Sequence, residues 1–290
     1  LEVGLKVAKE VGADILIATD PDCDRVGIAV KQGDDFRLFS GNEVGVLLTD
    51  FIAKRKVAMG IMPKNPVLVK TIVTTDLAKR VADDYGIETR DVLTGFKYIG
   101  DQIAGLEKDG EVDRYLLGFE ESYGYLSGSY VRDKDAVNGS YLIAQMFAYY
   151  KAQNKSLLDV LNGLYEKYGY YLNTLYSFEF EGESGMKKMD AIMDTFRNNT
   201  PKEIAGVKVL EVRDYETSTQ TNLVTGEKKA IDLPKSNVIK YMLEGNSSAV
   251  LRPSGTEPKL KLYLAISSEN EASARELESK IANEIKKSLA

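Results

Sequence analysis

The amino-acid sequence predicts an α/β unit, in which helices cover a mixed sheet, followed by an α+β unit built on an antiparallel sheet. Two observations carry this prediction. Between residues 36 and 119, short apolar runs alternate with segments of helical periodicity, which is the pattern of a sheet covered by helices. After about residue 168, several strand-like segments share only two helical ones, which is typical of an antiparallel α+β unit. The length of 290 residues fits about two domains.

The first segments of the chain predict a helix and a pair of strands. The opening residues place Val3, Val7 and Val11 on one helical face. The apolar run Ile15–Ala18 is followed by an acidic loop and by a second run, Val26–Val30. The uninterrupted apolarity of these runs predicts strands that are covered on both faces. Because the chain starts within a helix and without an initiator methionine, we expect it to be an excerpt of a longer protein.

A polar turn at residues 31–35 marks the first domain boundary. The elements predicted after it are a helix at 43–59, a strand at 67–73, a helix at 76–85, a strand at 87–93, a helix at 97–108, a strand at 115–119 and helices at 135–151 and 156–168. The pattern changes near Tyr170. The elements predicted from there are a strand at 171–180, a helix at 184–198, strands near 207–213, 238–243, 248–252 and 259–267, and a helix at 270–288. The chain is therefore divided into residues 1–34, 35–168 and 169–290.

The composition excludes several kinds of chemistry and partner. The sequence has no histidine, which excludes Ser-His-Asp triads, Cys-His dyads and His-ligated metals. The single cysteine, Cys23, excludes an internal disulfide and fits a reducing compartment, so we expect a cytoplasmic protein. A net charge of −6 favours neither nucleic acid nor an anionic membrane as a partner. No apolar run approaches the roughly 20 residues that span a bilayer.

The sharpest local signal is the acidic loop DPDCDR at residues 20–25. Its three aspartates alternate at the carboxyl end of an apolar strand, where the ligands of α/β sheets collect. Alternating carboxylates on a short loop can converge on one hard cation such as Mg²⁺. A solvated turn is the other interpretation. An EF-hand is rejected because it requires Gly and Glu where this loop has Arg25 and Lys31.

A phosphohydrolase of the haloacid-dehalogenase type is a second competitor for the acidic loop. In that interpretation Asp20, the first aspartate after the strand, is the nucleophile. Such enzymes also carry an acidic pair directly after a later strand, whereas Asp83 and Asp84 fall inside a predicted helix. The fit is therefore poor.

The second signal is the segment LRPSGTEPK at residues 251–259. A Ser-Gly-Thr turn offers successive backbone N–H groups and two hydroxyls, and Arg252 adds a planar guanidinium, so that together they can bind a phosphate dianion. Lys261 adds charge if its side chain lies on the same side of the strand. A plain β-turn is the other interpretation.

The third signal is LGFEESYG at residues 117–124, at the end of a predicted strand. Glu120 and Ser122 lie two residues apart and point the same way on a strand-like segment, an arrangement that suits the vicinal hydroxyls of a sugar. A strand-end turn is the other interpretation. The segments TGFK at 94–97 and RDKD at 132–135 are weaker signals, because exposed lysines are usually just solvated.

Taken in order, DPDCDR, TGFK, GFEES, RDKD and LRPSGTEPK resemble the α-D-phosphohexomutase family, and within it the bacterial phosphoglucomutase-like phosphosugar mutases. Members of this family have four domains. They convert a sugar 1-phosphate to its 6-phosphate through a bisphosphorylated intermediate and an active-site phosphoserine. The resemblance covers essentially the whole chain. It implies that residues 1–34 are the end of domain 2 with the metal loop, 35–168 the sugar-binding domain 3, and 169–290 the phosphate-binding domain 4.

The resemblance also implies a role for each motif. The implied residues are Asp20, Asp22 and Asp24 for Mg²⁺; Glu120 and Ser122 for sugar hydroxyls; Thr94 and Gly95 for further substrate contacts; Arg252, Ser254, Gly255, Thr256 and Lys261 for the non-reacting phosphate; and Arg25, Lys97 and Lys134 as catalytic groups. Arg25 would contact the phosphate of the phosphoserine. Because there is no histidine, a lysine is the most reasonable acid or base, and the choice between Lys97 and Lys134 stays open.

One feature departs from the family pattern. The nucleophilic serine of the family lies in a T-A-S-H-N-P-like loop of domain 1, and this sequence has neither that motif nor any histidine. We therefore expect a C-terminal fragment of a mutase that interconverts glucose 1-phosphate and glucose 6-phosphate, inactive by itself. The alternatives are a phosphomannomutase of the same family and a stand-alone phosphosugar-binding module. The segment at 120–124 and Lys134 favour the phosphoglucomutase branch.

Overall fold

The computed structural model describes residues 1–180, 182–255 and 257–289. Within these residues the chain divides into two compact units, Leu1–Tyr168 and Gly169–Ala290. None of the helices in this described part of the chain has the length and apolar character that crossing a membrane requires.

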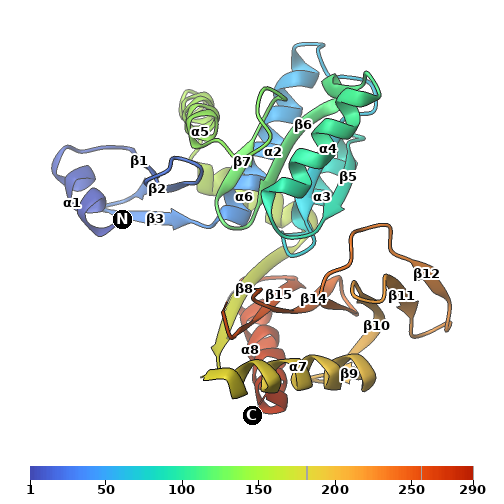
Figure 1. Ribbon diagram of the computed structural model, residues 1–290. Helices are drawn as coiled ribbons and strands as arrows, with labels where there is room; N and C mark the ends of the chain where they lie inside the picture. The colour runs from blue at the N-terminus through green and yellow to red at the C-terminus, as the bar shows by residue number, and fades with distance from the viewer. Residues whose placement is uncertain (181, 256, 290) are drawn as a thin grey trace. The chain divides into compact units, whose positions relative to one another are not determined.

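The first unit contains two sheets and most of the helices (Figure 1). Its elements are α1 (Glu2–Glu10), β1 (Ile15–Thr19), β2 (Val26–Gln32), β3 (Asp35–Phe39), α2 (Gly41–Ala58), β4 (Val67–Thr71), α3 (Leu77–Asp84), β5 (Glu88–Val92), α4 (Phe96–Lys108), β6 (Tyr115–Glu120), β7 (Gly124–Leu126), α5 (Ala136–Lys151) and α6 (Leu157–Tyr168). The predicted helices and strands of this region are confirmed to within a few residues at their ends. Strands β3 and β7 were not predicted.

Strands β1, β2 and β3 form a small antiparallel sheet in that order. Ile15 pairs with Val30 and Thr19 pairs with Val26, so the acidic loop at residues 20–25 is the connection of a β-hairpin. The hairpin therefore presents the loop at one end of the small sheet.

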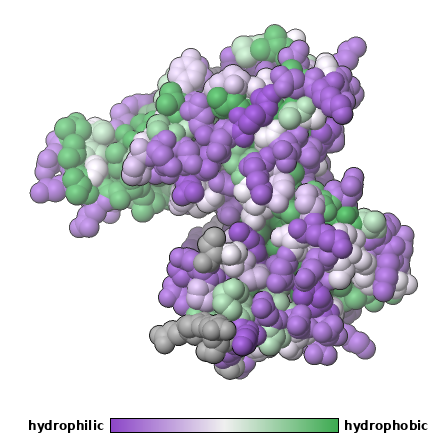
Figure 2. Space-filling model, viewed as in Figure 1, coloured by the Kyte–Doolittle hydropathy of each residue, from purple (hydrophilic) through white to green (hydrophobic). Residues whose placement is uncertain are grey.

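The expectation that both apolar strands are covered on both faces is wrong for β1. Val26 and Ile28 of β2 are buried, whereas the apolar residues of β1 are only half-buried. The physical reason is that β2 is the central strand of this sheet and β1 lies at its edge. The apolar face of α1 is exposed as well: Val3 and Val11 keep 79% and 72% of their surface accessible. Figure 2 shows green, apolar atoms at the end of the first unit that carries this helix.

The second sheet of the first unit has the strand order β5-β4-β6-β7. β4 is parallel to β5 and β6, and β7 is antiparallel to β6. Val69 belongs to a core cluster with Ile99 and Ile103 of α4, whereas Gly45 of α2 lies against the ring of Phe119, so α2 and α4 cover opposite faces of this sheet (Figure 1). The prediction of a mixed sheet covered by helices is confirmed.

The second unit is an antiparallel sheet with two long helices. Its elements are β8 (Tyr170–Glu179), α7 (Gly182–Asn198), β9 (Glu203–Ile204), β10 (Val207–Asp214), β11 (Thr219–Asn222), β12 (Lys228–Ala230), β13 (Ile239–Leu243), β14 (Ser247–Pro253), β15 (Lys259–Ser268) and α8 (Glu271–Leu289). The strand order is β12-β11-β10-β13-β14-β15-β8, with β9 paired to β10. The predicted α+β unit is confirmed, and the short strands β9, β11 and β12 were not predicted.

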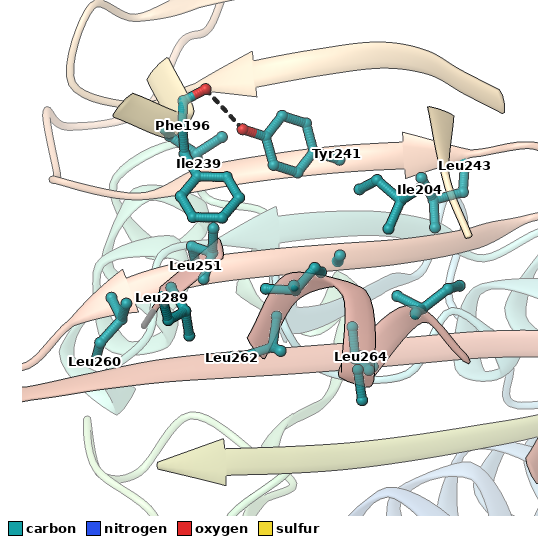
Figure 3. Packing of buried hydrophobic residues seen from close by; sticks show 14 of the residues in the cluster. Phe196, Ile204, Ile239, Tyr241, Leu243, Leu251, Leu260, Leu262, Leu264 and Leu289 are labelled. Atoms are coloured by element: carbon teal, nitrogen blue, oxygen red, sulfur yellow. Dashed lines mark hydrogen bonds between the residues drawn. The ribbon is translucent and has the colours of Figure 1, made fainter. Parts of the chain in front are cut away.

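One face of the second sheet carries the core of this unit (Figure 3). Alternate residues of β13, β14 and β15, including Tyr241, Leu251 and Leu262, pack with apolar residues of α7 and α8. The hydroxyl of Tyr241 donates a hydrogen bond of 2.8 Å to the carbonyl of Phe196 in α7. The intervening residues of the strands face the other way, and Arg252 is one of them.

Candidate functional site

The three aspartates of the hairpin loop come together. One carboxylate oxygen from each of Asp20, Asp22 and Asp24 lies within 4.8 Å of the other two, and Asp22 is the most exposed of the three. An oxygen-lined group of this kind is what a hard divalent cation requires.

Backbone hydrogen bonds give the loop its shape. The Oδ1 atom of Asp20 accepts from the backbone N–H groups of Asp24 and Arg25, at 3.1 and 3.0 Å. The bond from Arg25 is the largest of several effects that hold the pKa of Asp20 below its usual value. Cys23 has a φ of 57°, and its carbonyl accepts from the N–H of Ala136 at the start of α5. The loop is therefore fixed at both its first aspartate and its turn.

Lys134 is brought to the same loop by the segment that leads into α5. Its ammonium lies 2.6 Å from Oδ2 of Asp24 and 3.3 Å from Oδ1 of Asp133. Partial burial opposes the charged form, but the hydrogen bond to Asp24 and the charges of both carboxylates prevail and raise the pKa of Lys134. Lys134 is thus a firmly protonated cation next to one of the predicted metal ligands.

Asp24 also carries an oxygen without a hydrogen bond. Its Oδ1 atom is buried, and no hydrogen-bond partner for it is found in the described part of the chain. Nε of Arg25 lies 3.7 Å from this atom, which is beyond hydrogen-bonding distance. Buried carboxylate oxygens are normally satisfied, so this atom needs a further partner. The three aspartates therefore fit a divalent cation on an observation that is independent of their spacing.

The hairpin loop is joined directly to the turn that contains Glu120 and Ser122. Arg25 forms an isolated β-bridge with Gly124, and the N–H of Val26 donates 3.1 Å to the carbonyl of Tyr123. Because β6 ends at Glu120 and β7 begins at Gly124, this bridge places the acidic loop beside the end of the mixed sheet. The predicted metal and sugar residues of the first unit thus form one continuous group.

Glu120 is a buried carboxylate in this group, with 7% of its surface accessible. Burial raises the pKa of Glu120, and the negative charge of Glu121 adds to the rise. A hydrogen bond with Ser122 and the charges of Lys134 and Arg25 act in the opposite direction. Glu120 therefore lies close to both predicted cations and to the predicted hydroxyl.

Gly124 provides the surface on which two of these side chains lie. A Cβ atom at this position would stand 2.6 Å from Cδ of Lys134 and 3.0 Å from Cγ and Oε1 of Glu120. The absence of a side chain at Gly124 therefore allows the ammonium of Lys134 and the carboxylate of Glu120 to approach the same point.

The TGFK segment lies at the start of α4. Gly95 is the residue before the helix and has a φ of 115°, a conformation that favours glycine, and Thr94 before it is half-buried. The ring of Phe96 lies 6.0 Å from the ammonium of Lys134, so the start of this helix is near the cluster. Lys97 itself is exposed, with its ammonium above the ring of Tyr98, and no ion pair among the described residues links it to the aspartates.

In the second unit, Arg252 and Lys261 lie opposite each other on β14 and β15. Cross-strand partners project to the same face of a sheet, so the condition that Lys261 shares the side of Arg252 is met. The guanidinium of Arg252 donates to the hydroxyl of Tyr263 at 3.3 Å. Two like charges directly opposite each other are unfavourable unless an anion lies between or above them.

The turn after β14 carries the remaining predicted phosphate residues. The N–H of Ser254 donates 2.7 Å to the carbonyl of Lys259, which closes the turn. A Cβ atom on Gly255 would meet no atom within 4 Å, so the backbone there is open to a ligand. Thr256 was predicted as a phosphate contact and lies outside the described residues.

Sequence reasoning did not assign a role to Glu121, Thr71 or Thr74. The side chain of Glu121 accepts hydrogen bonds from both threonines, which lie at and just beyond the end of β4. Functional groups gather at the carboxyl ends of strands, and this rule applies to the acidic loop and equally to the polar residues at and beyond the end of β4.

Comparison with known proteins agrees with this geometry. Residues 40–168 match the family model described as phosphoglucomutase/phosphomannomutase, alpha/beta/alpha domain III. A phosphoglucomutase from Staphylococcus saprophyticus is 39% identical over 269 residues, which cover 92% of this chain and 48% of that protein. The chain spans about half the length of the curated relatives that it matches.

Solved structures share the fold at lower identity. The open form of parafusin, a phosphoglucomutase from Paramecium, matches with a TM-score of 0.65 at 18% identity. The match covers 96% of this chain and 44% of the parafusin chain. An N-acetylphosphoglucosamine mutase from Aspergillus fumigatus, solved with glucose 1,6-bisphosphate, matches with a TM-score of 0.51 at 15% identity. The match covers 97% of this chain and 52% of the mutase chain. At these identities the likeness concerns the fold.

Proposed function

The chain belongs to the α-D-phosphohexomutase family, and from this membership we propose that it forms part of a phosphosugar mutase that interconverts glucose 1-phosphate and glucose 6-phosphate. Residues 1–34, 35–168 and 169–290 would correspond to the end of domain 2, domain 3 and domain 4. Because β3 completes the first sheet, this proposal moves the boundary between the first two parts from residue 34 to Phe39. The nucleophilic phosphoserine would lie outside this chain.

The observation that carries the proposal is the convergence of the acidic loop at residues 20–25, the cation Lys134 and the turn that bears Glu120 and Ser122 in the first unit. Lys134 contacts Asp24 and lies against the same glycine as Glu120. Carboxylate and hydroxyl groups suit sugar hydroxyls, while the cations Arg25 and Lys134 suit a phosphoryl group. Phosphoryl transfer depends mainly on such positioning and charge neutralisation.

The aspartates Asp20, Asp22 and Asp24 would hold Mg²⁺. When bound, the metal would supply positive charge to neutralise the transferring phosphoryl group. Oxygen ligands from three carboxylates are the donors that Mg²⁺ prefers, and the buried Oδ1 of Asp24, which has no hydrogen-bond partner among the described residues, supports this assignment.

The two lysines would have different roles. A lysine that is bonded to carboxylates keeps its proton and is a poor base, which describes Lys134. We therefore assign Lys134 to phosphate binding and Lys97 to proton transfer with the sugar hydroxyl. In the second unit, Arg252 and Lys261 with the turn at Ser254 and Gly255 would bind the phosphate that does not react. Glu120 and Ser122 would bind hydroxyls of the sugar.

The proposed location is the cytoplasm, because a single cysteine, Cys23, fits a reducing compartment.

Calorimetric titration of the chain with MgCl₂, and then with glucose 1-phosphate, mannose 1-phosphate and inorganic phosphate, tests this proposal. We expect Asp24→Asn to weaken Mg²⁺ binding by at least about tenfold. Asp133→Asn is the matched control, because Asp133 is a neighbouring carboxylate that is not in the metal group. We also expect sugar phosphates to bind more tightly than inorganic phosphate.

The outcomes separate the candidate functions. Stronger binding of mannose 1-phosphate would favour a phosphomannomutase of the same family. Equal weakening by Asp24→Asn and Asp133→Asn would contradict the metal assignment. Because the serine is expected outside the chain, the purified chain should convert no glucose 1-phosphate, and conversion would favour a complete enzyme over a part of one.

A further inference from the structure

The turn between β6 and β7 carries Ser122, and its middle is fastened by Glu121. The Oε2 atom of Glu121 lies 3.2 Å from Oγ1 of Thr71 and 3.2 Å from Oγ1 of Thr74. The two threonine hydroxyls lie 2.8 Å from each other. Because they share two protons, two of these three contacts can be hydrogen bonds at one time, and the charged carboxylate is the stronger acceptor.

Both threonines are buried, with 0% and 2% of their surfaces accessible for Thr71 and Thr74. A buried hydroxyl without an acceptor costs free energy, so each gains from the nearby carboxylate of Glu121. Moving the Glu121 side chain away would leave the two buried hydroxyls with only each other as partners. The contact with Glu121 is therefore stabilising.

A buried lysine fixes the position of one threonine. Lys70 is fully buried on β4, and its ammonium donates to the carbonyl of Thr74 at 3.2 Å and pairs with Asp76 and Asp91 at 2.8 Å each. Two carboxylates compensate for the burial of this cation and hold the segment that follows β4. The hydroxyl of Thr74 is consequently presented to Glu121 by a segment that is bonded to Lys70.

The backbone of the same turn is closely packed against the start of α2. A Cβ atom on Gly41 would stand 2.1 Å from the carbonyl oxygen of Glu121 and 2.8 Å from the nitrogen of Tyr123. The carbonyl of Tyr123 in the same turn accepts a hydrogen bond from the N–H of Val26, the first residue of β2 after the acidic loop. The turn therefore lies between three fixed neighbours: β4, α2 and the hairpin.

We infer that Glu121 is a positioning residue, which fastens the turn bearing Glu120 and Ser122 to Thr71 and Thr74 and thereby sets the spacing of the hydroxyl-binding groups. This inference rests on the proposed function, because it assumes that Glu120 and Ser122 bind a sugar. Glu121 itself points to the threonines and makes no contact with the sugar in this assignment. Its effect is on recognition of the sugar and not on recognition of the phosphate.

The test compares variants that remove or keep the acceptor. Glu121→Leu removes the acceptor, whereas Glu121→Gln keeps an amide oxygen that can accept hydrogen bonds from the threonines. The double variant Thr71→Val with Thr74→Val removes the two donors at nearly constant side-chain shape. The first readout is the ratio of the affinities of the chain for glucose 1-phosphate and inorganic phosphate. The second is amide hydrogen exchange at residues 121–124, with β13 as an internal reference.

We expect Glu121→Leu and the double valine variant to lower the affinity ratio by about tenfold, and to speed exchange at 121–124 but not in β13. Glu121→Gln should restore most of the ratio. An unchanged ratio in the double valine variant, which keeps the packing, overturns the inference even if Glu121→Leu folds poorly.

The two proposals fail in different ways. If the unaltered chain binds glucose 1-phosphate no better than inorganic phosphate, the proposed sugar recognition fails, and the positioning role fails with it. If the unaltered chain does discriminate but the variants discriminate equally well, the proposed function stands and Glu121 has no positioning role.

Discussion

The ammonium of Lys134 lies 2.6 Å from Oδ2 of Asp24, so a cation of the chain is paired with one carboxylate of the three-aspartate loop. The other oxygen of Asp24 has no hydrogen-bond partner among the residues that the structure describes. One oxygen of this carboxylate is therefore bonded to a cation of the chain, and the other, which faces Arg25 only at 3.7 Å, is left for the metal ion in the proposed function. A metal ion bound to this aspartate would share it with Lys134. The repulsion between the two positive charges would lower the affinity for the metal ion.

Replacing Lys134 by methionine is expected to tighten the binding of Mg²⁺. The change removes a competing positive charge while it keeps most of the apolar stem that lies against Gly124. We expect an affinity roughly three- to tenfold higher, which corresponds to about 1 kcal/mol, measured by calorimetric titration with MgCl₂. Binding of glucose 1-phosphate should weaken at the same time.

Lys97→Met is the matched control for that prediction. It removes the same charge from the same unit, but its ammonium lies above Tyr98 and is not paired with the aspartates. Its Mg²⁺ affinity should therefore stay within about twofold of the unaltered chain. Equal effects of the two substitutions would show that only net charge matters.

The raised pKa of Glu120 makes the stability of the first unit depend on pH. The folded unit binds a proton on this carboxyl at pH values where the unfolded chain, with a pKa near 4.5, has lost it. The contribution of this carboxyl to the stability of the folded unit is fully present below pH 4.5 and is lost as the pH rises through the raised pKa. Glu120→Gln cannot ionise, so its melting temperature relative to the unaltered chain should increase over that window in metal-free buffer. Calorimetric melting of both proteins across a pH series checks this, and a difference that does not vary with pH would refute it.

Gly124→Ala should disturb both the site and the fold. The added methyl group displaces the side chains of Lys134 and Glu120, and we expect about tenfold weaker binding of glucose 1-phosphate with a stability loss of about 1–3 kcal/mol. Gly105→Ala in α4 is the control, because a Cβ there meets no atom within 4 Å. It should stabilise the helix by about 0.5–1 kcal/mol and leave binding unchanged. If both variants bind alike, the role of Gly124 as a contact surface is disproved.

The secondary structure was predictable where apolar periodicity is strong. The helices of both units and the apolar strands such as β4 and β14 bury regular sets of side chains, and these sets are visible in the sequence. The missed strands lack that signal. β12 is exposed along its length and β11 is a polar run, so pairing with neighbouring backbone defines them and burial does not. β7 has only three residues, too few for an alternating pattern.

The site was predictable in its parts and not in its contacts. The motifs identified Asp24, Lys134 and Glu120 separately, because each residue type and its local spacing are visible in the sequence. The β-bridge between Arg25 and Gly124 that joins two of the motifs depends on how the hairpin packs on the mixed sheet, and no local pattern records it. Glu121 was not assigned a role because its partners lie at the end of a different strand and just after it, and they become its neighbours only in the folded unit.

The cross-strand pair of Arg252 and Lys261 predicts that phosphate stabilises the second unit. Without an anion the two charges repel, so Lys261→Met should melt no lower than the unaltered chain in phosphate-free buffer. Added phosphate should bind the folded unit at this pair and raise the melting temperature by mass action. The stabilisation by saturating phosphate should be about 1 kcal/mol smaller in Lys261→Met than in the unaltered chain.

Lys228→Met is the control, because it removes a lysine of the same unit on the exposed strand β12, away from the pair. Phosphate should stabilise it as much as the unaltered chain. Calorimetric melting with phosphate or chloride at matched ionic strength measures both effects. Equal gains in all three proteins would mean that phosphate acts on the unit nonspecifically, and the pair would then not be a phosphate site.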